Sequence, residues 1–499
     1  MKAMPPIPSL SISGRAARGA LGLSLCALLG ACAVGPDYHR PDAPVAASYK
    51  ELAGWRPASP DAELAPKGEW WRAFHDPLLD ELEPQVIVSN QTVRQSYANY
   101  QQALAEVRVA QSSLFPTIGL TGSATRQRSN GGTSLGGASR VQSSGSLEGS
   151  ADWELDIWGR IRRTIEENKA VAQADEALLA SAALSEQIAL ANAVVELRTA
   201  DADIDLLQRT VSAYEASLRV VENQSRAGTA APSDLMTALT QHDSARASLI
   251  SLGVARAQYE HAIAVLVGKN PAELAIAHNG RLPDLPEVPV GLPSELLQRR
   301  PDIAAAERQM AAQNAAIGVA VAAYYPTISL SGLLGFTQSP LSGLLNAANR
   351  VWSLGADANA TLFDGGARSG AVRAAQAAYD AEVANYRGTV LAAFQGVEND
   401  LSGLRILAQQ AEAQRAAVDH ATQGARITLN EYQAGTVDYT TVATTQATLL
   451  SNQQSLLNVE SQRRLDAVSL IGDLGGGWEG LKEPAAEATA PSASATEKQ

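Results

Sequence analysis

Five acidic residues alternate with apolar residues in two short segments, residues 145–156 and 351–362. These acids are Glu148, Asp152, Glu154, Asp156 and Asp357. Alternate side chains of a β-strand point to opposite faces, so the acids would share one face and the apolar residues the other. Carboxylates that line a water-filled passage would favour cations and polar solutes. The alternative interpretation is a solvated acidic face without selectivity.

The sequence contains no residue pattern typical of an enzyme. Its six histidines are scattered without metal-ligand spacing, and no glycine-rich loop follows a strand in a phosphate-binding form. We interpret Gly475-Gly476-Gly477 as part of a flexible tail. We therefore expect no catalytic residue, no metal and no cofactor other than a covalent lipid.

Cys32 is the residue expected to carry that lipid. It ends the run Leu29-Gly30-Ala31-Cys32, which follows a basic region and a short apolar stretch at residues 20–29. Such a stretch is too brief to span a bilayer and is typical of a signal peptide. The four-residue run is similar to the cleavage box of bacterial lipoproteins, so a signal peptide over residues 1–31 and acylation of Cys32 are predicted. Ala33 rather than Asp follows the cysteine, which favours the outer membrane. An incidental Cys32 in an ordinary signal peptide is the alternative.

The charge balance is acidic, with 39 Lys and Arg against 52 Asp and Glu. This balance argues against nucleic acid as a partner. Beyond the predicted signal peptide, no run of 18 uninterrupted apolar residues occurs. Any membrane crossing would then use β-strands closed into a barrel, because open sheet edges cannot face lipid.

The chain carries an internal duplication. Phe115-Pro116-Thr117-Ile118 returns as Tyr325-Pro326-Thr327-Ile328, and Ala227-Gly228-Thr229 returns as Ala434-Gly435-Thr436. Repeats of this size determine the fold. The predicted organisation is a lipidated N-terminal segment (32–85), a first repeat (86–290), a second repeat (291–471), and an equatorial end with a disordered tail (472–499).

Each repeat is expected to contain a helix, two strands and a long helical hairpin. The strands are predicted at about residues 117–126, 145–156, 326–337 and 351–362. Clean alternation over roughly ten residues is typical of an outer-membrane strand, although strands of soluble sandwiches alternate too. Four strands are too few to close a barrel, for which about eight are needed. A dimer would give a nearly solid barrel of eight strands, whereas a trimer would pool twelve and leave room for a lumen.

The helical hairpins are predicted at about residues 159–267 and 366–471. The first helix of each lacks proline over a length of roughly 100 Å. Apolar residues in steps of three and four, as in Val397, Leu401 and Leu404, indicate a coiled coil. Gly228 and Gly435 are expected to make the tight turns at the two tips, because glycine adopts the left-handed conformation without strain.

Several motifs together resemble the TolC-like outer-membrane efflux proteins, and most closely the lipoprotein branch typified by OprM and NodT. They are Arg299-Arg300-Pro301-Asp302-Ile303, Cys32-Ala33-Val34-Gly35-Pro36-Asp37-Tyr38, the run from Trp153 to Arg160, and Tyr432-Gln433-Ala434-Gly435-Thr436. The resemblance covers about residues 32–475. No single motif among them is specific by itself.

The resemblance implies an α+β membrane protein that forms a homotrimer. A twelve-stranded barrel in outer-membrane lipid would continue into a periplasmic helical barrel with a mixed equatorial domain. Its implied partners are a periplasmic adaptor protein and an inner-membrane transporter of the resistance-nodulation-division type. The adaptor would dock at the tips, which contain Gly228, Thr229, Gly435 and Thr436.

The sequence departs from the family at the gate expected near the second tip. The family often places a carboxylate ring one turn into the helix after this tip, where this chain has Thr441 and Thr444. Asp438 and, in the first repeat, Asp234 are therefore the candidates for a pore constriction. An ordinary helix cap is the alternative role of Asp438.

The resulting functional prediction is the exit duct of a tripartite pump that exports drugs or other small toxic compounds. A duct for type I protein secretion is the first alternative, because the same architecture can serve it. A structural coiled-coil lipoprotein that spans the periplasm is an alternative of another class, which predicts no ion conductance.

Overall fold

The computed structural model describes residues 33–43, 46, 48–51, 68–129, 140–286, 299–478 and 481. The chain forms two compact units. The strand unit comprises the segment up to Pro41, Gln101–Ala172 and Glu307–Ala384, and the helical unit comprises Asp42–Tyr100, Gln173–Ala306 and the segment from Asn385 onward. The predicted signal peptide, Cys32 and most of the predicted C-terminal tail lie outside the described residues.

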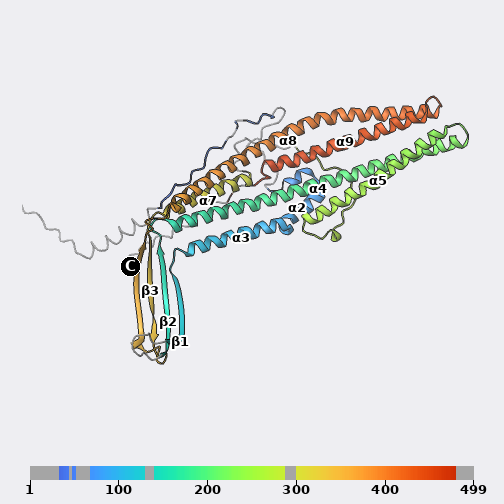
Figure 1. Ribbon diagram of the computed structural model, residues 1–499. Helices are drawn as coiled ribbons and strands as arrows, with labels where there is room; N and C mark the ends of the chain where they lie inside the picture. The colour runs from blue at the N-terminus through green and yellow to red at the C-terminus, as the bar shows by residue number, and fades with distance from the viewer. Residues whose placement is uncertain are drawn as a thin grey trace, which may run out of the picture. The chain divides into compact units, whose positions relative to one another are not determined.

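The strand unit contains a four-stranded antiparallel sheet with the order β1-β2-β3-β4 (Figure 1). Its strands are β1 (Thr117–Ser129), β2 (Arg140–Leu155), β3 (Thr327–Gln338) and β4 (Arg350–Asn359). The central pair, β2 and β3, joins the two repeats. Among the described residues, β1 and β4 each pair with one neighbour only, so each leaves one edge of the sheet open.

The strand bounds differ from the predicted ones at both ends of the sheet. Pairing of β1 with β2 continues to Ser129 opposite Arg140, into polar residues where the alternation has already stopped. In contrast, β4 ends at Asn359, opposite the first residue of β3, Thr327. Backbone pairing needs a partner strand rather than an alternating pattern, and this explains both differences.

The helices that precede β1 and β3 each end a few residues before a proline. α3 (Gln91–Ser112) and α7 (Pro301–Ala322) are followed by Pro116 and Pro326, whose rings cannot continue a helix. Before β1, the structure has two helices rather than one, because Asn90 separates α2 (Pro77–Ser89) from α3. The Asn90 side chain caps α3, accepting from the backbone N–H of Thr92 (2.8 Å).

Two long helical hairpins complete the fold, and each follows one strand pair in sequence. α4 (Arg160–Arg226) pairs with α5 (Pro232–Leu266), and α8 (Ala367–Gln433) pairs with α9 (Tyr439–Asp473) (Figure 1). Val397, Leu401 and Leu404 of the predicted heptad pattern are buried. By length and composition, α4 alone among the helices of the described segments could also cross a membrane, which is weak evidence for a span.

The helical unit has its largest core around the aromatic residues that begin the folded chain. Trp70, Trp71 and Phe74 pack with residues of α2, α4, α8 and α9. Leu274 and Leu285, from the segment after α5, pack against the same core. Leu474, from the end of the helical hairpin, also packs there, so segments far apart in the sequence contribute residues to one cluster.

The interpretation of Gly475-Gly476-Gly477 as a flexible tail was wrong. All three glycines have positive φ and form a tight turn that ends α9. The N–H of Gly476 donates to the carbonyl of Ile471 (2.9 Å), as in a Schellman motif. A Cβ on Gly475 would lie 2.1 Å from the carbonyl oxygen of Arg299, so a side chain is excluded there.

Candidate functional site: a two-faced sheet and two helical tips

The strand register places the predicted acids on one face of the sheet. Glu154 lies opposite Ser329, which lies opposite Asp357 on the far side, so two acids share one row across three strands. Asp152 lies two residues from Glu154, and Glu148 lies four residues further along the same face of β2. The fifth acid, Asp156, follows the last residue of β2.

Two of the five acids are neutralised at the junction between β2 and α4. The guanidinium of Arg160 donates to both carboxylate oxygens of Glu154 at 2.8 Å. Asp156 accepts from the backbone N–H of Ile161 (2.9 Å) and pairs with Arg162 (3.1 Å). The remaining acids of this face are Glu148, Asp152 and Asp357. Asp156 acts mainly as a cap of the first turn of α4.

The opposite face of the sheet is apolar and open. Ile118, Leu120 and Leu354 are 80%, 76% and 81% exposed. Leu334 pairs with Gly149 on one side and with Trp352 on the other, so the apolar band is continuous across the strands. Exposed apolar area on this scale is unfavourable in water, and an outer-membrane strand presents such a band to lipid.

The two helical tips share one backbone structure. Gly228 and Gly435 have φ of 74° and 73°. The N–H of Thr229 donates to the carbonyl of Gln224 (2.9 Å), and the N–H of Thr436 donates to that of Glu431 (3.0 Å). Both turns are Schellman motifs, in which glycine supplies the left-handed residue. No heavy atom lies within 4 Å of a Cβ placed on either glycine, so the backbone angle alone restricts these positions.

Asp438 is the N-cap of α9. Its carboxylate accepts from the backbone N–H of Thr441 (2.9 Å) and from the hydroxyl of the same residue (2.7 Å). The side-chain hydrogen bond and then the backbone hydrogen bond from Thr441 lower the pKa of Asp438. Its side chain remains exposed, so capping leaves the charge open to the solvent. Asp234 lies in the first turn of α5.

Contacts between the two hairpins near the tips were missed by the sequence analysis. The hydroxyl of Tyr432 donates to Gln224 (2.6 Å), and that of Tyr439 donates to Gln241 (3.2 Å). The two tyrosine rings pack edge to face at 5.4 Å, within a cluster that includes Val221. In the sequence, the only signal for these contacts was the position of the two tyrosines on either side of the glycine turn. Their hydrogen-bond partners lie about 200 residues away in the sequence.

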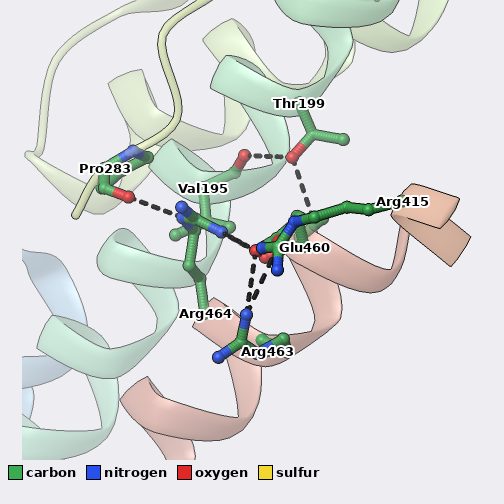
Figure 2. A network of polar contacts seen from close by, with 8 residues as sticks. Val195, Thr199, Pro283, Arg415, Glu460, Arg463 and Arg464 are labelled. Atoms are coloured by element: carbon green, nitrogen blue, oxygen red, sulfur yellow. Dashed lines mark hydrogen bonds and ion pairs between the residues drawn. The ribbon is translucent and has the colours of Figure 1, made fainter. Parts of the chain in front are cut away.

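A second polar network, further from the tips, centres on Glu460 of α9 (Figure 2). Its carboxylate pairs with Arg415 of α8 and with Arg463 and Arg464 of α9. Burial opposes ionisation, yet the hydrogen bond from Arg464 and the charges of the arginines lower the pKa of Glu460. Arg464 also donates to the carbonyl of Pro283 (2.5 Å), which ties α9 to the segment after α5 (Figure 2).

The segment after Cys32 is bound to the strand unit. The N–H of Val34 donates to the carbonyl of Trp158 (3.1 Å). Arg163, near the start of α4, donates to the carboxylate of Asp37 (2.9 Å). Ala33 packs against Gly159 so closely that a Cβ there would lie 2.8 Å from the Cα of Ala33. Cys32 itself lies outside the described residues.

The described residues contain no group of three or more His, Cys, Asp or Glu side chains that could hold a metal ion. The arrangement that they do contain is a sheet with one acidic and one apolar face, joined to long helical hairpins. Such a sheet separates water from lipid. This arrangement is typical of the class of outer-membrane channels.

The comparisons with known proteins identify the family within this class. The sequence profile described as "Outer membrane efflux protein" matches residues 82–269 and 292–476. The chain belongs to this family. The two matched segments fall on the two halves of the duplication.

Several relatives are similar over nearly their whole length. The probable efflux pump outer membrane protein TtgC of Pseudomonas putida is 34% identical over 90% of this chain and 94% of its own. Outer membrane protein OprJ of Pseudomonas aeruginosa is 30% identical over 92% of this chain and 96% of its own. The solved outer-membrane channel OprN has a TM-score of 0.83 at 31% identity, covering 90% of this chain and 100% of that chain.

These findings confirm the predicted fold class, location and function. The chain has the α+β fold of the solved outer-membrane channels of this family, and its own sheet has four strands. It is an outer-membrane efflux channel. The family is one of transport channels rather than of known enzymes.

Proposed function

We propose that three copies of this chain assemble into the exit duct of a tripartite pump. The sheet is the observation that carries the proposal. A four-stranded sheet with two open edges cannot reside in lipid, because unpaired backbone groups there cost several kcal/mol each. Three copies would pair β4 of one with β1 of the next and close a barrel of twelve strands. Its acidic face would line a lumen, and its apolar face would contact lipid.

Exposed apolar residues on the helices support the same assembly. Ile250 and Val254 of α5 are 68% and 61% exposed, one helical turn apart, and Leu391 and Ile406 of α8 are also exposed. A neighbouring copy would remove this area from water, at about 25 cal/mol per Å². In this assembly, the tips with Gly228 and Gly435 are the proposed docking surface for a periplasmic adaptor.

The exported compounds are proposed to be drugs or other small toxic compounds, delivered by a resistance-nodulation-division transporter in the inner membrane. Relatives named for antibiotic and toluene efflux support this proposal. No resident cofactor is proposed. These names favour efflux over type I protein secretion, and the predicted lipid anchor favours it as well.

Acylation of Cys32 is part of the proposal, and the docked N-terminal segment supports it. Ala33, the residue that directly follows the predicted acylation site in the sequence, packs against Gly159. Gly159 lies between the end of β2 and the start of α4.

Two measurements test the proposal. Purified full-length protein should form a trimer that conducts ions in planar bilayers, and its gene should restore drug efflux to cells that lack their own duct. A monomer, or a trimer without conductance, would contradict the channel and favour the structural lipoprotein. Conductance with restored protein secretion, but without restored drug efflux, would favour type I secretion.

A further inference from the structure

Charged residues on the described strands divide between the two faces of the sheet. The acids lie on one face, as described above. Arg350 lies opposite Phe336, which lies opposite Leu147, so this arginine lies on the apolar face. Arg126 and Arg128 continue the face of Leu120 at even spacing along β1. All three arginines are exposed.

The three arginines also lie at one end of the sheet. Arg126 and Arg128 are near the last residue of β1, and Arg350 is the first residue of β4. This end carries the connection between β3 and β4, and the helices join the opposite end (Figure 1). The arginines therefore belong to the boundary of the apolar band that faces the cell exterior.

The dimensions of β4 agree with this boundary. At about 3.3 Å per residue and a tilt of about 40°, its ten residues span about 25 Å along the membrane normal, which is the usual height of the apolar band. Trp352, 69% exposed, follows Arg350 on the same face. An aromatic ring at this level is typical of the membrane–water interface. Arginine on the lipid face is unfavourable in the hydrocarbon and tolerated near the interface, so the guanidinium groups lie at the level of the headgroups.

We propose that Arg126 and Arg128 of one copy and Arg350 of the next form an anion site on the lipid-facing surface, which binds phosphate groups of outer-leaflet lipid. The two arginine sets lie on the two open edges of the sheet, which meet when three copies close the barrel. The guanidinium fork matches the geometry of phosphate oxygens and binds them through paired hydrogen bonds. The pairing of the two edges rests on the proposed trimer.

The test measures binding of purified lipopolysaccharide to the full-length protein in detergent. Three additives are compared, namely intact lipopolysaccharide, the same material after removal of its phosphates, and inorganic phosphate. The test variant is Arg126→Gln/Arg128→Gln/Arg350→Gln. A matched variant, Glu148→Gln/Asp152→Asn/Asp357→Asn, removes three charges from the opposite face.

We expect intact lipopolysaccharide to raise the melting midpoint of the natural protein and of the acid-face variant. The dephosphorylated material should not do so. The arginine variant should bind about 100-fold more weakly, because each basic residue near an anionic surface contributes a factor of several. Equal binding of both lipopolysaccharides, or unchanged binding by the arginine variant, would overturn the proposal. If inorganic phosphate at the same concentration competes with lipopolysaccharide, the site binds free phosphate, and the proposal of a lipid ligand is overturned.

Two controls keep the result interpretable. The arginine variant should conduct ions normally, which shows that its barrel is assembled. If the arginine variant does not fold, a variant with Arg→Lys at the same three positions replaces it. Lysine keeps the charge but lacks the planar guanidinium fork, so this variant should bind lipopolysaccharide with intermediate affinity. Failure of the natural protein to form a conducting trimer would instead contradict the proposed function.

Discussion

The buried carboxyl of Glu83 makes the stability of this channel depend on pH. Glu83 is 0% exposed, and in the described structure neither of its carboxylate oxygens has a hydrogen-bond partner. Leu79, Leu82 and Val86 of the same helix belong to the core around it. Burial raises the pKa of Glu83 from 4.5 to about 9, so the folded protein holds this carboxyl neutral at pH 7.

The sign and size of the effect follow from proton binding. The unfolded chain releases this proton near pH 4.5, whereas the folded chain retains it to about pH 9. The contribution of Glu83 to the unfolding free energy is fully present below pH 4.5. It is lost as the pH rises toward 9, by about 1.4 kcal/mol per pH unit. Between pH 5 and pH 7, Glu83 should thus remove about 3 kcal/mol of unfolding free energy.

The substitution Glu83→Gln should abolish this pH dependence. Glutamine has nearly the same shape but no ionisation, so the unfolding free energy of the variant should fall less steeply from pH 5 to pH 8. The measurement is urea unfolding of the full-length protein, followed by helical circular dichroism at each pH. The slope with pH is the readout, because the buried amide changes the absolute stability by itself.

The exposed Glu81 on the same helix provides the matched control. Glu81→Gln makes the same substitution at the surface and should leave the pH slope of the unfolding free energy as it is in the natural protein. If Glu83→Gln and the natural protein lose stability in parallel from pH 5 to pH 8, the carboxyl is not held neutral, and the argument from burial is refuted.

Three further substitutions test the tips and the acidic face. If the 2.6 Å hydrogen bond from Tyr432 to Gln224 holds the tips closed, Tyr432→Phe removes about 1 kcal/mol from the closed state. Open tips should then become about fivefold more populated and single-channel conductance should rise, whereas unchanged conductance would contradict this role. Asp438→Ala and Asp438→Ser should both raise conductance if the charge narrows the pore. An increase with Ala alone would assign Asp438 to capping, since Ser retains the cap. Asp152→Asn combined with Asp357→Asn should reduce the cation preference measured from reversal potentials in a salt gradient, and an unaltered potential would mean that these acids are merely solvated.

The local elements of this protein could be predicted because their signals lie within a few residues of each other. Alternation of apolar and polar residues predicted the strands and assigned Glu148 and Asp357 to the polar face. Gly228 and Gly435 predicted the tip turns, because a left-handed residue ends a helix where a side chain would be strained. The duplication predicted that each of these elements would occur twice.

Long-range contacts depend on residues far apart in sequence, and only the tertiary structure could establish them. β2 pairs with β3 across the two repeats, and this register brings Glu154 and Asp357 into one row. The position of Arg160 determines that Glu154 is neutralised, so the charge of a face cannot be read from its acids alone. The backbone of Arg299 excludes a side chain at Gly475, which makes that glycine part of a packed turn rather than of a flexible tail. The periodicity of apolar residues along the chain indicates which face of a strand or helix a residue occupies. The residues that it contacts depend instead on how separate segments of the chain pack together.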